Sequence, residues 1–123
     1  MSLKRIIAVV EDNPDNRLLL RALLEPRYDI QEYEDGLKAL EQMPQQKPDL
    51  VLMDISLPHL SGVEVLAKMR EDEALKDIPV ISVTAHAMSG DREKYLGYGF
   101  NDYLAKPIWD ENQLYSTIDK LLS

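Results

Sequence analysis

Short apolar segments alternate with amphipathic segments along the whole chain. The apolar segments predict five β-strands, which lie at Arg5–Val10, Asp29–Tyr33, Leu50–Asp54, Val80–Thr84 and Asp102–Ala105. Three of these segments are almost continuously apolar, because they contain the runs IIAVV, LVLM and VISV. Such uninterrupted runs are typical of strands in a parallel sheet that is covered on both faces.

Helix signals follow the predicted strands. Asn13 and Pro14 provide an N-cap and a proline at the first helical position, and they predict a helix through about Leu24 that ends before Pro26. The other helices are predicted to begin at Asp35-Gly36, Ser61-Gly62, Ser89 and near Asp110. The fourth is expected to run to Tyr98, with Gly99 in the left-handed conformation that often ends a helix.

Apolar residues at helical spacing predict which face of each helix points inward. Leu37, Leu40 and Met43 form one stripe of the second helix before Pro44. The third helix has Val63, Leu66, Ala67 and Arg70 at helical spacing, and the fifth has Leu114, Ile118, Leu121 and Leu122 on its inner face. Strand and helix alternate without a repeat or linker, which predicts a doubly wound α/β fold, a five-stranded parallel sheet flanked by five helices. We expect a single domain over residues 1–123.

The composition narrows the functional class. Acidic residues number 22 against 14 Lys and Arg, which gives a net charge of -8, and no basic cluster is visible, so we expect no direct binding to nucleic acid. The apolar runs are far shorter than the ~20 residues of a membrane helix, so we expect no membrane insertion. Cysteine is absent and the N-terminus lacks a signal-peptide pattern, which favours a cytoplasmic location.

Polar residues stand where four of the five predicted strands end. They are Glu11, Asp12, Asp54, Thr84 and Lys106. Carboxyl ends of parallel strands meet at one edge of the sheet, where ligands bind in such folds. Converging carboxylates repel one another unless a cation joins them, and an all-oxygen ligand set selects a hard ion such as Mg²⁺. A cation, an ammonium and a hydroxyl together suit a phosphoryl group, and an aspartate can be the nucleophile.

Each of these positions also has a simpler explanation. Glu11 and Asp12 could cap the first helix and complement its dipole. Thr84 alone is explained as an ordinary strand residue, and Lys106 alone as a solvated turn residue. Asp54 is harder to explain in this way, because it closes an apolar strand where an unpaired carboxylate is costly. The joint occurrence of these residues at four strand ends favours a site.

The order of the motifs resembles the receiver domain of two-component response regulators. The matching motifs are Glu11-Asp12-Asn13, Met53-Asp54, Leu57-Pro58, Ser61-Gly62, Val83-Thr84-Ala85 and Lys106-Pro107. The resemblance covers essentially the whole chain and includes the spacing of the motifs. It implies the flavodoxin-like topology of that family, and a phosphoacceptor signalling switch as the function.

The resemblance implies a role for each carboxylate. Asp54 matches the aspartate that takes a phosphoryl group from a sensor histidine kinase or a histidine phosphotransfer protein. Asp12 matches a direct ligand of Mg²⁺ (or Mn²⁺), and Glu11 a ligand that acts partly through water. Asp54 and the backbone carbonyl of Ser56 would complete the protein ligands. Such a domain is not an enzyme in the usual sense, although it assists its own Mg²⁺-dependent phosphorylation and dephosphorylation.

The resemblance also implies a conformational switch. Thr84 matches the hydroxyl that bonds the phosphoryl oxygen, and Lys106 matches the ammonium that neutralises it. Tyr103 matches the aromatic residue that turns inward when Thr84 moves. Ser56 and His86 match positions that tune the lifetime of the phosphoryl group.

The surface that reports phosphorylation would comprise the fourth helix, the fifth strand and the fifth helix, and it would bind a downstream protein partner. Trp109 is a candidate anchor on that surface, and a packing role is an equal alternative. The motifs fit a stand-alone regulator and a receiver taken from a hybrid kinase or a larger regulator equally well.

Three other functional classes compete with a phosphorylated receiver. A nucleotide-binding domain would need a glycine-rich loop after the first strand, and the chain has none there. A magnesium-dependent phosphatase with an aspartate nucleophile would place that nucleophile after the first strand, with a second aspartate where Ser56 stands. A phosphorylation-independent interaction adaptor with a receiver fold stays open as the alternative.

Overall fold

The structure is a computed structural model that describes residues 4–84, 91–106 and 110–122. Its strands are β1 (Ile6–Val10), β2 (Asp29–Tyr33), β3 (Leu50–Asp54), β4 (Val80–Thr84) and β5 (Asp102–Ala105). Its helices are α1 (Pro14–Leu24), α2 (Gly36–Gln46), α3 (Gly62–Glu71), α4 (Asp91–Tyr98) and α5 (Glu111–Leu122). Across the described residues, strands and helices alternate as the sequence pattern predicts.

The strands form one parallel sheet in the order β2-β1-β3-β4-β5. This is the flavodoxin-like order, and it confirms the predicted doubly wound five-stranded parallel sheet. The chain runs outward from β1 to β2 and then returns to the other side of β1, where Val10 pairs with Met53 of β3. The loops after β1 and β3 therefore diverge at this reversal of direction, the usual ligand position in such sheets.

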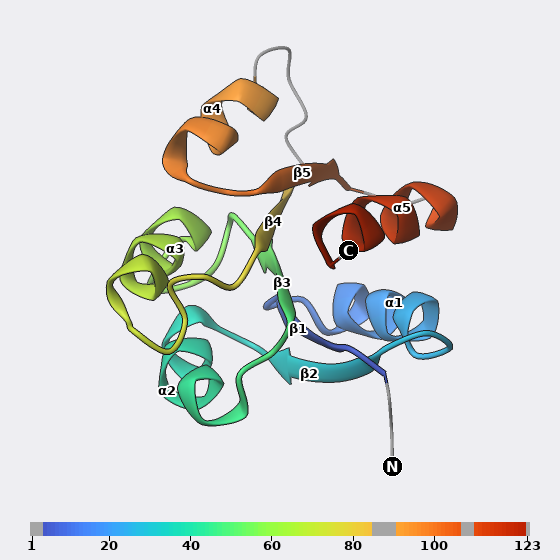
Figure 1. Ribbon diagram of the computed structural model, residues 1–123, viewed down its shortest axis with the longest axis horizontal. Coiled ribbons are helices and arrows are strands. Elements are labelled where there is room, and N and C mark those ends of the chain that lie inside the picture. Colours follow the sequence, from blue (N-terminus) through green and yellow to red (C-terminus); the bar gives the residue numbers. More distant parts are fainter. Residues whose placement is uncertain (1–3, 85–90, 107–109, 123) are drawn as a thin grey trace.

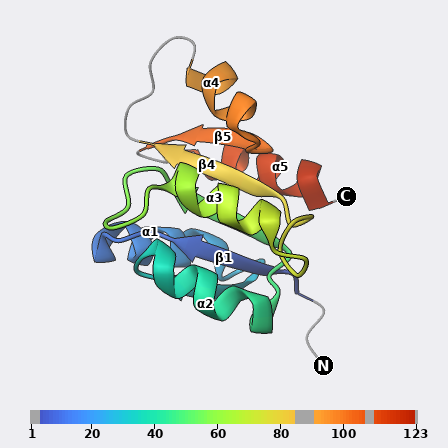
Figure 2. The same cartoon turned by 90° about the vertical axis from the view of Figure 1, so that its left-hand side faces the viewer.

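Helices cover both faces of the sheet. Figure 1 shows α1 and α5 on one face and α2, α3 and α4 on the other. In Figure 2 the arrowheads of β4 and β5 point to the same end of the molecule, as parallel pairing requires. The carboxyl ends of the strands are therefore gathered at one edge of the sheet.

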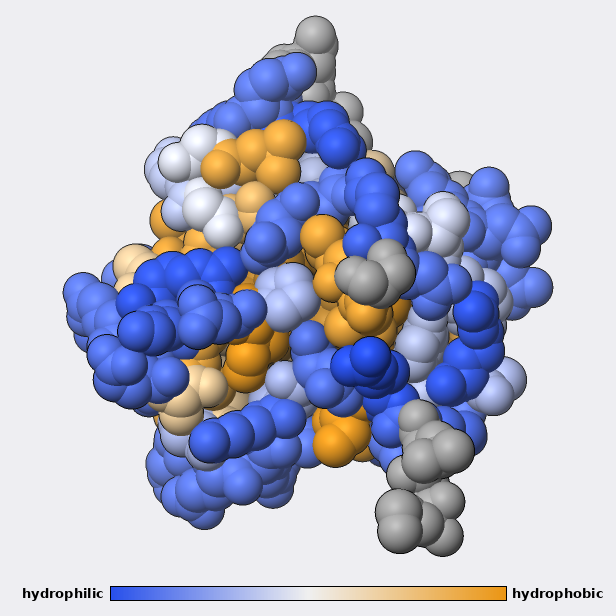
Figure 3. Space-filling view, viewed as in Figure 1, coloured by the Kyte–Doolittle hydropathy of each residue, from blue (hydrophilic) through white to orange (hydrophobic). Residues whose placement is uncertain are grey.

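Two hydrophobic clusters pack against the sheet, one on each face. β3 is buried along its whole length, and its side chains alternate between the clusters. Val51 and Met53 join the cluster that contains Val65 of α3, whereas Leu52 joins the cluster that contains Ile118 of α5. Figure 3 shows mainly hydrophilic side chains over α2 and α3, with hydrophobic ones visible between the elements and over α4. This burial explains why the central strands read as continuous apolar runs.

The capping signals in the sequence are confirmed at the first three helices. The Asn13 side chain accepts hydrogen bonds from the backbone N–H groups of Asp15 and Asn16, at 2.8 and 3.2 Å. Asp35 caps α2, and Ser61 forms a reciprocal capping box at the start of α3. Each cap fixes where the chain leaves the site edge and enters a helix.

The inner faces of α2 and α3 differ from the predicted ones. Leu37 was expected to point inward, yet it is 53% exposed, and Gly36, Ala39 and Met43 are buried instead. The reason is a close helix contact, because a Cβ at Gly36 would clash with Cγ2 of Val65 on α3. The small residues of α2 therefore face α3. In α3 the predicted Leu66 is buried, but Ala67 is exposed and its place is taken by Val65 and Met69.

Some predicted boundaries also need correction. α2 continues through Pro44 to Gln46, because a proline near the end of a helix removes only one late hydrogen bond. β1 begins at Ile6, one residue after the predicted start. Gly99 has a φ of 111°, so its predicted left-handed conformation is confirmed. Ser89, the predicted start of the fourth helix, lies outside the described residues.

Among the helices in the described part of the chain, none has the length and apolar character needed to cross a membrane.

Candidate functional site

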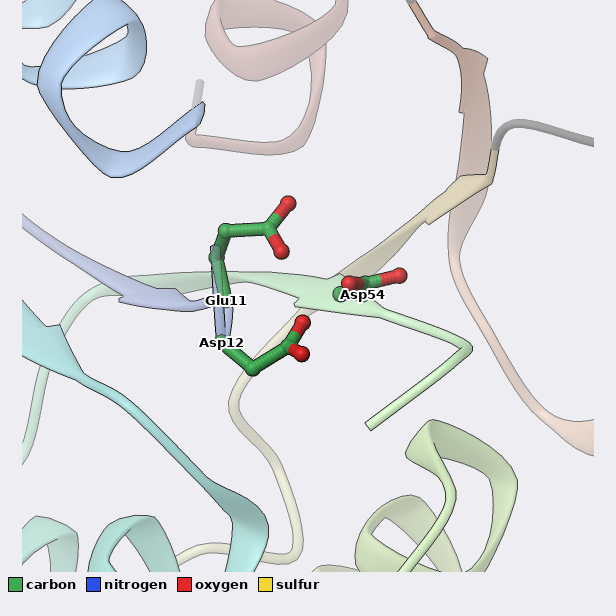
Figure 4. Close-up of side chains that lie close together, drawn as sticks. All are labelled: Glu11, Asp12 and Asp54. Carbon is green, nitrogen blue, oxygen red and sulfur yellow. The ribbon is translucent and has the colours of Figure 1, made fainter. Parts of the chain in front are cut away.

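Three carboxylates converge where β1 and β3 end. Glu11 and Asp12 follow β1 directly, and Asp54 is the last residue of β3. One oxygen atom from each of the three groups lies within 4.8 Å of the others. Figure 4 shows the side chains gathered beside the ends of the two strands. The sequence predicted this meeting from strand ends alone, and the sheet order makes the two strands neighbours.

The site combines buried and exposed acidic groups. Glu11 is 2% exposed and Asp54 is 5% exposed, whereas Asp12 is exposed. Lys106, which follows β5, places its Nζ 2.5 Å from Oε1 of Glu11 and 3.3 Å from Oδ2 of Asp54. One ammonium therefore bridges two buried carboxylates and offsets part of their charge.

Burial and mutual repulsion change the protonation of these groups. Burial, followed by a hydrogen bond with Asp54, raises the pKa of Glu11 to about 7. Burial by itself would lower the pKa of Lys106, but the adjacent Glu11 and Asp54 carboxylates outweigh it, so that pKa is raised. Lys106 is thus held as a cation beside an acidic pair that is costly to ionise completely.

The ligand set fits a hard divalent cation. All three groups are carboxylates, and the chain contains no cysteine that could supply a thiolate. Burial and the adjacent Asp54 raise the pKa of Glu11, and a bound cation would favour its ionised form. Glu11, Asp12 and Asp54 are the residues that would hold such an ion.

Backbone contacts fix the position of Asp54. Its Oδ1 accepts a hydrogen bond from the backbone N–H of Ser56 at 3.0 Å. The next residue, Ile55, donates to the carbonyl of Val83 at 3.2 Å and accepts from the N–H of Gly62 at 3.0 Å. A Cβ at Gly62 would clash with the carbonyl oxygen of Asp54, so α3 begins in direct contact with this turn.

The other predicted residues lie around the same edge. Thr84 ends β4 and is buried, and its carbonyl accepts a hydrogen bond from the N–H of Lys106 at 2.8 Å. Tyr103 is half-buried, and its ring stacks on Tyr95 of α4 with 5.9 Å between centroids. The roles predicted for Thr84, Tyr103 and the Ser56 carbonyl stay predictions. His86 lies outside the described residues.

Trp109, the candidate partner anchor, and Pro107 of the last matching motif also lie outside the described residues.

Two contacts at the site were missed by sequence reasoning. Gly62 was interpreted only as the start of a helix, although it also touches the backbone of Asp54. Arg17 was not singled out, yet its guanidinium donates to the backbone carbonyl of Glu11. An arginine one helical turn after an acidic pair is a weak signal, because most such residues face solvent.

Comparison with known proteins extends the likeness to the whole fold. The chain matches the response regulator receiver domain family over residues 7–119. It is 45% identical over 103 residues to the polar-differentiation response regulator DivK of Brucella anthropi, a match that covers 83% of this chain and 84% of that protein. DivK of Brucella ovis is 46% identical over 103 residues, with the same coverage of 83% and 84%.

Solved structures agree with this assignment. The receiver domain of the sensor histidine kinase PA1611 from Pseudomonas aeruginosa PAO1, solved with a magnesium ion coordinated in its active site cleft, has a TM-score of 0.87 and 36% identity. That match covers 97% of this chain and 98% of the other. The N-terminal domain of a response regulator receiver protein from Methanoculleus marisnigri JR1 has a TM-score of 0.78 and 33% identity, covering 99% and 98% of the two chains. Fold, sequence and site geometry agree, and the chain belongs to the response regulator receiver domain family.

Proposed function

We propose that this receiver domain accepts a phosphoryl group on Asp54 in a reaction that requires Mg²⁺ (or Mn²⁺). The observation that carries the proposal is the convergence of Glu11, Asp12 and Asp54, with Lys106 bridging the two buried members. A bound cation would offset charge on the incoming phosphoryl oxygens. The magnesium ion in the related PA1611 receiver domain supports the same ligand chemistry.

The phosphoryl donor would be a phosphohistidine on a sensor kinase or a phosphotransfer protein. A carboxylate oxygen of Asp54 attacks phosphorus, the phosphorus–nitrogen bond breaks, and the imidazole leaves with the electron pair of that bond. The product is an aspartyl phosphate, whose phosphoryl oxygens carry a charge of about -1.5 to -2 that would be offset by the cation and by Lys106. The domain therefore acts as a signalling switch rather than as a conventional enzyme.

We propose that α4, β5 and α5 carry the signal to a downstream protein partner. Their contacts support a shared response, because buried Asp102 of β5 joins both helices. Its carboxylate lies 2.9 Å from Nη1 of Arg92 on α4 and 3.3 Å from Nζ of Lys120 on α5. Thr84 would bond the phosphoryl oxygen, and Tyr103 would turn inward in response. A cytoplasmic location of the protein fits both classes of phosphoryl donor.

The alternative is an adaptor that binds partners without phosphorylation. An adaptor would have no need for two carboxylates that are nearly inaccessible to water and that share one ammonium. Such an arrangement costs folding free energy. A site retained for phosphorylation explains this cost, which favours the phosphoacceptor over the adaptor.

Substitution of Asp54 by asparagine tests the proposed function. We expect wild-type protein, incubated with Mg²⁺ and acetyl phosphate, to gain the mass of one phosphoryl group, and Asp54→Asn to gain none. The control is Asp35→Asn, which makes the same chemical change at the N-cap of α2, where asparagine is an equally good cap. Labelling of Asp54→Asn at the wild-type rate would overturn the proposal, and absence of labelling in wild type would favour the adaptor.

A further inference from the structure

Arg17 contacts the backbone of both acidic residues that follow β1. Its Nη1 atom donates to the carbonyl oxygen of Glu11 at 2.7 Å and to that of Asp12 at 3.2 Å. Arg17 lies in the first turns of α1, and its own N–H donates to the carbonyl of Asn13 at 3.0 Å. One guanidinium group thus holds two consecutive peptide units of the segment that carries the site.

The segment of Glu11 and Asp12 follows the last residue of β1 that pairs with its neighbouring strands. The pairing of β1 ends at Val10, which is in register with Tyr33 on one side and Met53 on the other. The N–H of Glu11 makes one more bond, to the carbonyl of Tyr33 at 3.0 Å. After that, the strand ladder no longer determines where the Glu11 and Asp12 carbonyls point, and the contact with Arg17 does.

Arg17 is itself held from a second element. Its Nε lies 4.0 Å from Oε1 of Glu32 on β2, and only 20% of its side chain is exposed. Glu32 is fixed in turn by Arg21, whose Nε donates to Oε2 at 2.9 Å. The guanidinium of Arg17 therefore has a defined position, as a group needs if it is to orient others.

We propose that Arg17 is a positioning residue, which holds the Glu11–Asp12 segment so that both carboxylates face a shared divalent cation. This inference rests on the proposed function for the identity of the ion, and it adds a residue outside the family motifs described above. Arg17 acts through backbone carbonyl groups and touches none of the three carboxylates in these contacts.

Charge and geometry predict opposite effects of removing Arg17. If only its positive charge mattered, its loss would reduce repulsion of a nearby cation, and Mg²⁺ would bind more tightly. If Arg17 positions the ligands, its loss lets the segment relax, and Mg²⁺ binds more weakly. Second-layer contacts to metal ligands are worth about tenfold or more in affinity, which exceeds a screened charge effect at this surface.

Calorimetric titration with Mg²⁺ separates the two effects. We expect Arg17→Met to weaken Mg²⁺ binding by about tenfold, and Arg17→Lys to recover part of that loss because an ammonium can still donate to a carbonyl. The matched control is Arg27→Met, which also removes an arginine paired with one carboxylate, that of Asp119, but lies outside the chain of contacts that holds Arg17 in place. We expect it to bind Mg²⁺ as wild type does.

A second measurement uses metal-free protein. We expect Arg17→Met to speed amide hydrogen exchange at Asp12 and Asn13, while exchange at Ile7 and Val9 within β1 stays at the wild-type rate. Tighter or unchanged Mg²⁺ binding together with unchanged exchange would overturn the inference. If wild type binds no Mg²⁺, the proposed function fails, and the exchange rates still decide the role of Arg17. If Arg17→Met does not fold, Arg17→Lys carries the same comparison.

Discussion

Glu11 is a buried carboxylate that lies beside a second carboxylate. It is nearly inaccessible to solvent, it adjoins the Asp54 carboxylate, and its own carboxylate is paired with Lys106. Its second oxygen, Oε2, also accepts a hydrogen bond from the N–H of Asn13 at 3.2 Å. These contacts fix the position of a group whose ionised form is costly in this environment. The cost falls when a cation binds, so the same residue links metal binding to pH.

The raised pKa of Glu11 gives a pH dependence with a defined sign. The folded-state value of about 7 lies above the ordinary 4.5, so folding favours the protonated form of Glu11. The resulting stabilisation is full below the ordinary value and is lost as pH rises through about 7. In metal-free protein, denaturant titration at about pH 6 and about pH 8 should therefore show a larger fall in unfolding free energy for wild type than for Glu11→Gln.

Saturating Mg²⁺ reverses this trend, because the ion favours the ionised form of Glu11. Mg²⁺ should then raise the stability of wild type more at the higher pH than at the lower one. An identical pH slope in wild type and Glu11→Gln would show that the site is not strained in the way its contacts imply.

At the scale of elements, the entry into α3 is what holds the turn after β3. Gly62 donates to the carbonyl of Ile55, and a Cβ at this position would lie 3.0 Å from Cα of Ile55. Ser61 and Glu64 cap the same helix end reciprocally. The helix terminus and the turn after Asp54 are therefore packed backbone to backbone, and neither can shift without the other.

Gly62→Ala should damage both stability and phosphorylation. The added methyl group must displace the Asp54 backbone, which we expect to cost about 1–3 kcal/mol of unfolding free energy and to slow labelling by acetyl phosphate about tenfold or more. Urea titration and intact-mass kinetics measure the two effects. Gly97→Ala is the control, because a Cβ there would meet no atom of the described residues outside its own helix within 4 Å, and it should stabilise α4 by about 0.5–1 kcal/mol. Wild-type labelling of Gly62→Ala would show that the contact is not needed.

At the scale of the whole molecule, the sheet separates two hydrophobic clusters that share its strands. Successive residues of β3 belong to opposite clusters, so both clusters depend on the same strands and should be lost together on unfolding. A sheet buried on both faces predicts one cooperative unit over residues 1–123, as the sequence suggested.

Paired core substitutions test that unit. Ile118→Val on one face should cost about 1 kcal/mol, and Val65→Ala on the other about 2 kcal/mol. The sheet lies between these residues, so the loss of unfolding free energy in the double variant should equal the sum of the two single losses within about 0.5 kcal/mol. The double variant should unfold in one transition. Circular dichroism and tyrosine fluorescence, followed together in urea, measure it. Two separate transitions would mean that the chain contains more than one folding unit.

Sequence reasoning located the elements and the acidic cluster for a simple physical reason. Continuous apolar runs identified the buried strands, and parallel strands necessarily bring Glu11 and Asp54 to one edge. It placed Leu37 wrongly, because helical spacing counts apolar residues and does not detect that Gly36 lets α2 approach Val65. The contacts of Arg17 were equally invisible, since they depend on where a backbone points after its strand ends.

The stack of Tyr103 on Tyr95 joins the predicted switch residue of β5 to α4. If Tyr103 turns inward on phosphorylation, the stack is lost, and its free energy of about 0.5–1.5 kcal/mol belongs to the equilibrium constant of the switch. Consider a partner that binds α4 only while the stack is intact. Phosphorylation would then weaken the binding of this partner, and the bound partner would disfavour phosphorylation by the same factor. The protein that responds to this receiver therefore also sets how easily the receiver responds.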